Sequence, residues 1–256
     1  MSLKLYHHPV STCSQKVRLA LAEKGLTFDQ HIIDWSIIEH LSDWYLRINP
    51  NGVVPALVHD GNAVVDSSVI CEYVDEAFGE REISPHDVLG RAEMRAWMRY
   101  FEEVPTVAIR FSSFNKLFAK ALKERTASEF DEMTNKMPLR AHFYRQMGAQ
   151  GFSEKLVTES LEKLHKCLTR VADRLGDGRS FLLGDCYSIA DIVLVPSVVR
   201  MEDLGLAYVW EDLLHVQLWF ERVQSRPSFD IAYMTGSRVD PSNYIITQGH
   251  SKTASA

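Results

Sequence analysis

The sequence predicts an α/β domain followed by an all-helical domain, and three observations support this prediction. Strand and helix patterns alternate over the first 78 residues. A polar, proline-containing segment, residues 79–87, then marks the point where the strand signals stop. Beyond it, apolar residues recur almost throughout at helical spacing. The predicted fold class is α/β plus all-α, with one domain at residues 1–80 and a second at residues 88–256.

The first domain shows the order strand–helix–strand, then strand–strand–helix. Alternating apolar residues indicate the strands, and apolar residues three or four positions apart indicate the helices. Asp60-Gly61 favours a two-residue turn between the last two strands. The expected strands are residues 3–6, 28–33, 56–59 and 62–65, and the expected helices are residues 11–25 and 67–78.

Helices dominate the second domain. One of them, residues 154–175, has its leucines on a single stripe, with the charged residues off that stripe. The chain from about Met234 to Ala256 is polar and ends in Ser, Thr and Ala, so we expect a loose tail there. The expected helices are residues 92–123, 129–137, 154–175, 189–201 and 213–226.

Composition excludes several classes of function. The net charge is −6 and there is no long Lys/Arg block, so we expect no nucleic-acid partner. The four cysteines show neither zinc-ligand spacing nor a disulfide pattern. The first residues lack the apolar core of a signal peptide, and the most apolar stretch, residues 189–199, is too short to span a bilayer. We therefore expect a soluble cytoplasmic protein with no metal and no membrane partner.

Two short motifs of the first domain could bind a polar ligand. Val54-Pro55 precedes the third strand, and Asp66-Ser67 begins the helix after the hairpin. A serine hydroxyl and free N–H groups at a helix N-terminus suit a carboxylate, although simple N-capping needs the same residue types. In the second domain, Ser188-Ile-Ala-Asp191 has the pattern of a capping box, and we assign it a structural role only.

Together these features resemble the glutathione transferase superfamily, over nearly the whole chain up to about residue 230. The resemblance implies a thioredoxin-like first domain that holds glutathione and a helical second domain that shapes an apolar substrate pocket. Val54 and the cis-proline Pro55 would then bind the cysteinyl part of glutathione. Asp66 and Ser67 would bind its γ-glutamyl end. A homodimer, or a heterodimer with a related subunit, is also implied.

A narrower resemblance points to the bacterial glutathione transferases that cleave lignin β-aryl ethers. In that branch a Gln usually precedes the residue before the cis-proline, and this chain has Val53 there. One polar contact with glutathione is therefore expected to be missing. The matching segments are Asp43-Trp44, residues 48–50, residues 69–73 and residues 91–97.

The loop Ser11-Thr12-Cys13-Ser14 begins the first helix. A free thiol has a pKa near ~8.5, so a hydroxyl donor and a helix N-terminus would be needed to favour the glutathione thiolate. The resemblance assigns the hydroxyl to Ser11 by comparison with the zeta and related classes, and to Ser14 by comparison with the β-etherases. Cys13 is the rival, because a thiolate there would catalyse thiol exchange.

Aromatic residues crowd the start of the second domain, and we expect three of them, Tyr100, Phe111 and Phe114, to line an aryl pocket. The expected reaction is cleavage of a β-aryl ether to a phenol and a glutathione thioether. A zeta-like maleylacetoacetate isomerase is an alternative, with Arg110 or Arg18 holding its dicarboxylate substrate. Cys13-dependent thiol exchange and a non-enzymatic glutathione-binding module are the others.

Overall fold

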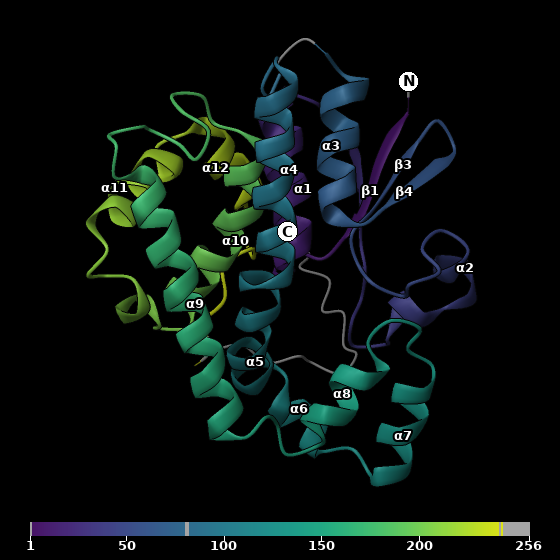
Figure 1. Ribbon diagram of the computed structural model, residues 1–256. Coiled ribbons are helices and arrows are strands. Elements are labelled where there is room, and N and C mark those ends of the chain that lie inside the picture. Colours follow the sequence, from purple (N-terminus) through teal and green to yellow (C-terminus); the bar gives the residue numbers. More distant parts are fainter. Residues whose placement is uncertain (1, 80–81, 241, 243–256) are drawn as a thin grey trace, which may run out of the picture.

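The computed structural model describes residues 2–79, 82–240 and 242 of the chain (Figure 1). The predicted fold class is confirmed: a four-stranded sheet with helices is followed by a helical region. The change falls between α3, which ends at Ala77, and α4, which begins at Val88. Residues 80 and 81 of the expected linker lie outside the described residues.

The sheet has the strand order β2-β1-β3-β4. β1 runs parallel to β2 and antiparallel to β3, and β3 pairs antiparallel with β4. α1 and α3 pack against each other, between the sheet and the helical domain in Figure 1. The elements of the first domain are β1 (Leu3–His7), α1 (Thr12–Lys24), β2 (Asp29–Ile32), η1 (Glu39–Leu41), α2 (Asp43–Leu46), β3 (Ala56–His59), β4 (Asn62–Val65) and α3 (Ser67–Ala77).

The register of the sheet brings three separate segments together. Ala56 lies opposite Tyr6 of β1 and opposite Val65 of β4. The loop after β1, the residues before β3 and the residues after β4 therefore meet at one end of the sheet. α1 and α3 both begin at this end, so the N-termini of two helices lie at the same end of the sheet.

The helix expected at residues 92–123 is wrong as a single element, because the structure divides it into α4, α5 and α6. Pro105 is the first residue of α5, and proline lacks the N–H needed to continue the helix before it. The helices of the second domain are α4 (Val88–Glu103), α5 (Pro105–Leu117), α6 (Ala119–Lys123), α7 (Ala127–Asn135), α8 (Ala141–Met147), α9 (Glu154–Leu175), α10 (Ile189–Asp203), η2 (Ala207–Val209), α11 (Leu214–Gln224) and α12 (Pro227–Ala232).

α10 is the buried helix at the centre of the second domain, and its predicted capping box is confirmed. The Asp191 carboxylate accepts hydrogen bonds from the N–H (3.0 Å) and hydroxyl (2.8 Å) of Ser188. Its other oxygen accepts from the Leu182 N–H (3.0 Å) and from the Trp219 indole (2.9 Å). The buried Asp191 side chain thus connects the start of α10 to α11 and to Leu182 in the loop before α10.

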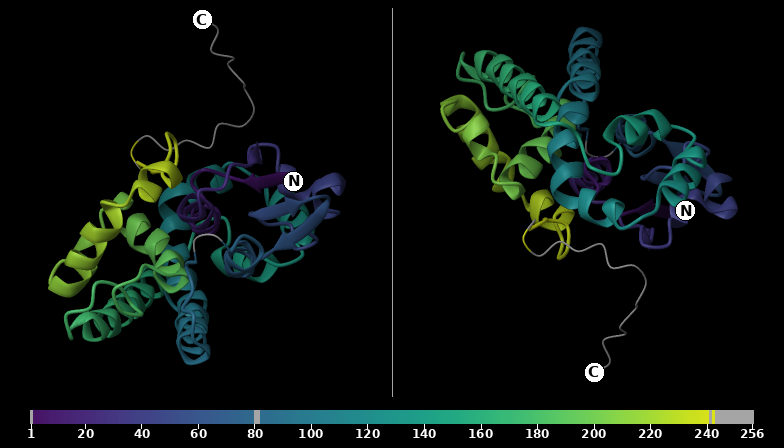
Figure 2. Two further views of the ribbon diagram at one scale, coloured as in Figure 1. Left: turned by 90° about the horizontal axis from the view of Figure 1, so that it is seen from above. Right: turned by 90° about the horizontal axis from the view of Figure 1, so that it is seen from below.

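The segment from α6 to α8 lies next to the first domain (Figure 1 and Figure 2), and its side chains contribute to a second apolar cluster. Ile38 and Leu41 of the first domain pack against this cluster. Gly52 shows how close the approach is, because a Cβ added there would lie 3.1 Å from the Pro138 ring. The cluster is built on Leu122, Phe130, Met133, Met137, Met147 and Phe152.

The loose tail expected from Met234 onward is wrong for the part that the structure describes. Ser237 is buried, its carbonyl accepts from the Gln15 side chain (2.9 Å), and its hydroxyl accepts from Arg18 (3.0 Å). Residues 241 and 243–256 lie outside the described residues. Within the described ranges, no helix combines the length and apolar character needed to cross a bilayer.

Candidate functional site

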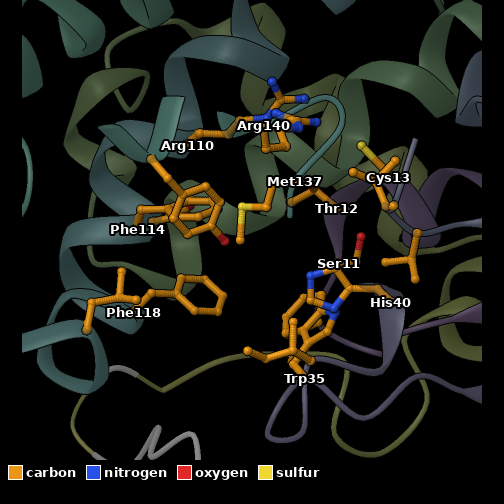
Figure 3. Close-up of a pocket in the computed structure, with 18 of the residues that line it drawn as sticks. Ser11, Thr12, Cys13, Trp35, His40, Arg110, Phe114, Phe118, Met137 and Arg140 are labelled. Carbon is orange, nitrogen blue, oxygen red and sulfur yellow. The ribbon is translucent and has the colours of Figure 1, made fainter. Parts of the chain in front are cut away.

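A cavity of about 210 Å³ lies where the end of the sheet meets α5 and the α6–α8 segment (Figure 3). The first domain contributes Val10, Ser11, Thr12, Cys13, Trp35, Ser36, Ile38, His40, Gly52, Val53 and Val54 to its wall. The helical domain contributes Ile109, Arg110, Ser113, Phe114, Phe118, Leu122, Arg125, Met133, Met137, Arg140, Tyr144 and Arg200.

Ser11 lies on the wall of this cavity as the N-cap of α1. Its Oγ accepts a hydrogen bond from the Ser14 N–H (3.3 Å), which leaves the hydroxyl proton free to be donated. The N–H groups of Thr12 and Cys13 have no hydrogen-bond partner within the described part of the chain. A hydroxyl donor and two unpaired helix N–H groups therefore meet at one point, an arrangement that favours an anion.

Ser14, the other serine predicted for this role, is placed differently. Its side chain is fully buried, does not line the cavity, and accepts a hydrogen bond from the His8 N–H (3.4 Å). The structure therefore brings Ser11, and not Ser14, to the cavity. Sequence reasoning missed Thr12 as a lining residue, although it belongs to the same loop.

Val54 presents a free backbone edge to the cavity. Its peptide bond to Pro55 is cis, as the resemblance implies, and Pro55 itself is not among the lining residues. Within the described residues, neither the N–H nor the C=O of Val54 is hydrogen-bonded. The preceding carbonyl, of Val53, accepts from the Tyr45 hydroxyl (2.7 Å) and from the Asn49 side chain (2.7 Å), which hold this loop in place.

Asp66 and Ser67 lie beside this edge but outside the cavity wall. The Asp66 carboxylate accepts from the N–H groups of Ser68 (3.0 Å) and Val69 (3.2 Å). Its φ of 74° is unusual for a residue other than glycine, a conformation that costs about 1–3 kcal/mol and is common at functional sites. The N–H and hydroxyl of Ser67 have no hydrogen-bond partner within the described chain, so they remain available for a ligand carboxylate.

A buried ion pair is hydrogen-bonded to the start of α3. Lys16 Nζ lies 2.6 Å from the Glu102 carboxylate and donates to Thr106 Oγ1 (3.0 Å). The Ser68 hydroxyl donates to the same Glu102 oxygen. Burial would raise the pKa of Glu102, but Lys16 and Ser68 outweigh it, so the pKa lies below the usual range of Glu. This network joins α1, α3 and α4, and no sequence pattern had pointed to it.

Only one of the three predicted aromatic residues lines the cavity. Phe114 lies on its wall. Tyr100 lies elsewhere, 4.3 Å from the Arg170 guanidinium, and Phe111 packs against Phe152 at 4.6 Å between ring centroids. The break before Pro105 separates Tyr100 from the helix that carries the other two.

The cavity carries positive charge on the side of the helical domain. Arg110 lines it, whereas Arg18, the other cation considered for an anionic substrate, is buried and donates to the carbonyls of Ala232 (2.8 Å) and Pro9 (2.9 Å). Burial lowers the pKa of His40, the histidine on the wall, to about 4, so it is neutral at pH 7. The arginines therefore supply the charge. They are Arg110, Arg125, Arg140 and Arg200.

Comparison with known proteins agrees with this arrangement. Residues 10–77 match the family model for the glutathione S-transferase N-terminal domain, and residues 154–222 match that for the C-terminal domain. Protein LigF of Sphingobium is 33% identical over 254 residues, covering 94% of this chain and 96% of LigF. Glutathione S-transferase TCHQD of Arabidopsis thaliana is 26% identical over 238 residues, covering 89% and 88%.

A solved structure gives the same result. The crystal structure described as β-etherase LigF from Sphingobium superposes with a TM-score of 0.81 at 31% identity, covering 91% of this chain and 99% of that one. The matches extend over both domains and over the segment between the two family models. The chain therefore belongs to the glutathione S-transferase family, and glutathione is its thiol substrate.

Proposed function

We propose that the protein cleaves β-aryl ether ketones with glutathione, releasing a phenol and forming a glutathione thioether. The observation that carries the proposal is the position of the Ser11 hydroxyl, in the same cavity as the free backbone edge of Val54 and the ring of Phe114. The relationship to LigF, described as a β-etherase, supports the choice of electrophile.

In this proposal the free polar groups of the first domain hold glutathione. The N–H and C=O of Val54 pair with the cysteinyl backbone, beside the sulfur position at the start of α1. The N–H and hydroxyl of Ser67 bind the γ-glutamyl carboxylate, and Asp66 lies next to its amino group. Each of these protein groups except the Asp66 carboxylate, which caps α3, is without a hydrogen-bond partner in the described chain, so binding adds bonds without breaking any.

The reaction is a substitution at carbon. The Ser11 hydroxyl and the first-turn N–H groups of α1 stabilise the glutathione thiolate. The thiolate attacks the carbon next to the ketone, a C–S bond forms, and the C–O bond to the aryl group breaks with its electron pair on oxygen. The departing phenolate then takes a proton from solvent. The rings of Phe114 and Phe118, 4.7 Å apart between centroids, offer an apolar surface for the substrate's aryl group.

Thiol exchange through Cys13 is a second candidate, because this cysteine also lines the cavity. A panel of electrophiles tests the choice: a β-aryl ether ketone, maleylacetoacetate and a mixed glutathione disulfide, each with glutathione and with products read by mass. We expect the ether to give a phenol and a thioether. Isomerised maleylacetoacetate or reduced disulfide as the only product would contradict the proposal.

A further inference from the structure

Two arginines from separate elements converge on one side of the cavity. Arg110 belongs to α5, and Arg140 lies immediately before α8. Figure 3 shows their guanidinium groups next to each other, on the side of the cavity away from Trp35. Within the described residues, neither guanidinium has a hydrogen bond or an ion pair.

The nearby acidic groups do not neutralise this pair. No carboxylate lines the cavity among the described residues. Glu102 feels the charge of Arg110, but its carboxylate is already bonded to Lys16 and Ser68. Burial lowers the pKa of Arg140, and the charge of Arg110 lowers it further. Glu102 also acts on Arg140 and opposes this shift, but in the described part of the chain no carboxylate forms an ion pair with either guanidinium, so the pair is a partly buried double positive charge without a bonded counter-ion.

Such an arrangement is unfavourable unless an anion completes it. An arginine stays protonated at any physiological pH, so the pair cannot relieve its repulsion by losing a proton. A guanidinium presents parallel N–H donors that fit a carboxylate in bidentate fashion. A carboxylate between the two groups would pair both charges at once.

Glutathione and the electrophile are the two possible sources of that carboxylate. Glutathione has two carboxylates: the γ-glutamyl one is assigned to Ser67, and the glycyl one is joined through a peptide bond to the cysteinyl part, which Val54 holds on the wall of the first domain. The two arginines instead share the helical wall with Phe114, where the aryl group is expected. Resting on the proposed ether cleavage, we propose that the electrophile is a carboxylated aryl ether, whose carboxylate binds Arg110 and Arg140 while its ring contacts Phe114.

The first test measures binding and does not depend on turnover. Benzoate is titrated calorimetrically into the glutathione-saturated protein, with benzamide as the uncharged probe. We expect Arg110→Gln and Arg140→Gln each to weaken benzoate binding at least tenfold and to leave benzamide binding unchanged. Arg145→Gln is the matched control, because Arg145 is an exposed arginine of α8 that donates to Asn135 (2.7 Å) and does not line the cavity.

The second test compares turnover of matched ethers that carry a carboxylate, or its methyl ester, on either aryl ring. We expect the wild type to prefer a carboxylate, and Arg110→Gln and Arg140→Gln to lower its kcat/KM at least tenfold with little change for the esters. Two results would overturn the proposal. One is benzoate binding that is unchanged in both variants, and the other is a tenfold loss of affinity for glutathione and not for benzoate. Loss of benzoate binding in the variants, with no ether cleaved by the wild type, upholds the carboxylate site and rejects ether cleavage.

Discussion

Replacing Ser11 with alanine should raise the pKa of the thiol of bound glutathione. A hydrogen bond to a charged group contributes about 1.5–3 kcal/mol. Since one pKa unit corresponds to about 1.36 kcal/mol, loss of the Ser11 donor should raise the thiol pKa by about 1–2 units. The free N–H groups of Thr12 and Cys13 remain, so part of the stabilisation of the thiolate persists.

The sign of the pH dependence follows from the thiolate being the reactive form. Below the wild-type thiol pKa, Ser11→Ala should react about 10–100-fold more slowly, because it holds that much less thiolate. Above the thiol pKa in the variant, the bound glutathione is fully ionised in both proteins, and the difference in rate should disappear. The assay is the ultraviolet absorbance of the thiolate in the binary complex, titrated with pH, together with the pH profile of kcat.

Ser14→Ala and Cys13→Ala serve as controls for Ser11→Ala. Ser11 also caps α1, so its loss should cost about 1 kcal/mol of folding stability, and the measurements belong well below the melting temperature. Ser14→Ala removes a buried serine that does not face the cavity and should leave the thiol pKa unchanged. An unchanged thiol pKa in Ser11→Ala, or complete loss of turnover in Cys13→Ala alone, would refute the reasoning.

Three further predictions concern ligand binding and stability. Glutathione at ~100 times its dissociation constant should stabilise the wild type by about 2.7 kcal/mol in thermal unfolding, and Asp66→Ala or Ser67→Ala should largely abolish this gain; equal dissociation constants in all three proteins would contradict it. Asp191→Ala leaves four buried donors without an acceptor and should lower the urea unfolding free energy by about 3–5 kcal/mol, whereas Asp173→Ala on the exposed face of α9 should change it little. Glu102→Gln should destabilise by about 3 kcal/mol at pH 7, because it leaves the charge of Lys16 buried and unpaired. The pKa of Glu102 is depressed in the folded state, so the wild type should exceed Glu102→Gln in unfolding free energy by the full amount above the unfolded pKa of about 4.3, and by less as the pH falls below it. A difference in unfolding free energy that is the same at pH 6 and pH 3 would count against this network.

The sheet and the residues at its end could be predicted because their signals are local. A turn at Asp60-Gly61 sets the register of β3 and β4, and that register places Val54 beside Asp66. The capping box before α10 is likewise a pattern of four consecutive residues. Motifs of this kind are read from short spacing, without knowledge of how the domains pack.

The wall of the cavity on the helical side depends on long-range packing and could not be predicted. Met137 and Arg140 reach the cavity only because the α6–α8 segment docks against Ile38 and Leu41. Nothing in the local sequence distinguishes these residues from an ordinary apolar and charged helix surface. Tyr100 does not line the cavity for a different reason: it belongs to α4, which ends before Pro105, whereas Phe114 belongs to α5. The helix-breaking effect of proline is a local signal of the sequence.

The sequence of the Ser11–Ser14 loop does not predict which of its two serines faces the cavity. Both hydroxyls belong to one loop, three positions apart, and either could face a ligand. The chain leaving β1 brings the His8 N–H over Ser14 and buries that side chain, which leaves Ser11 at the cavity. Tertiary contacts, and not spacing, separate the two.

Intact-protein mass spectrometry during turnover tests the central claim most directly, that glutathione thiolate stabilised at Ser11 attacks the ether carbon itself. The protein is quenched with acid while it converts a β-aryl ether ketone with excess glutathione, and protein and small products are weighed together. Direct substitution predicts unmodified protein throughout, with the phenol and the glutathione thioether formed in equal amounts. A glutathione or substrate adduct on Cys13 that appears and decays with turnover would contradict the account.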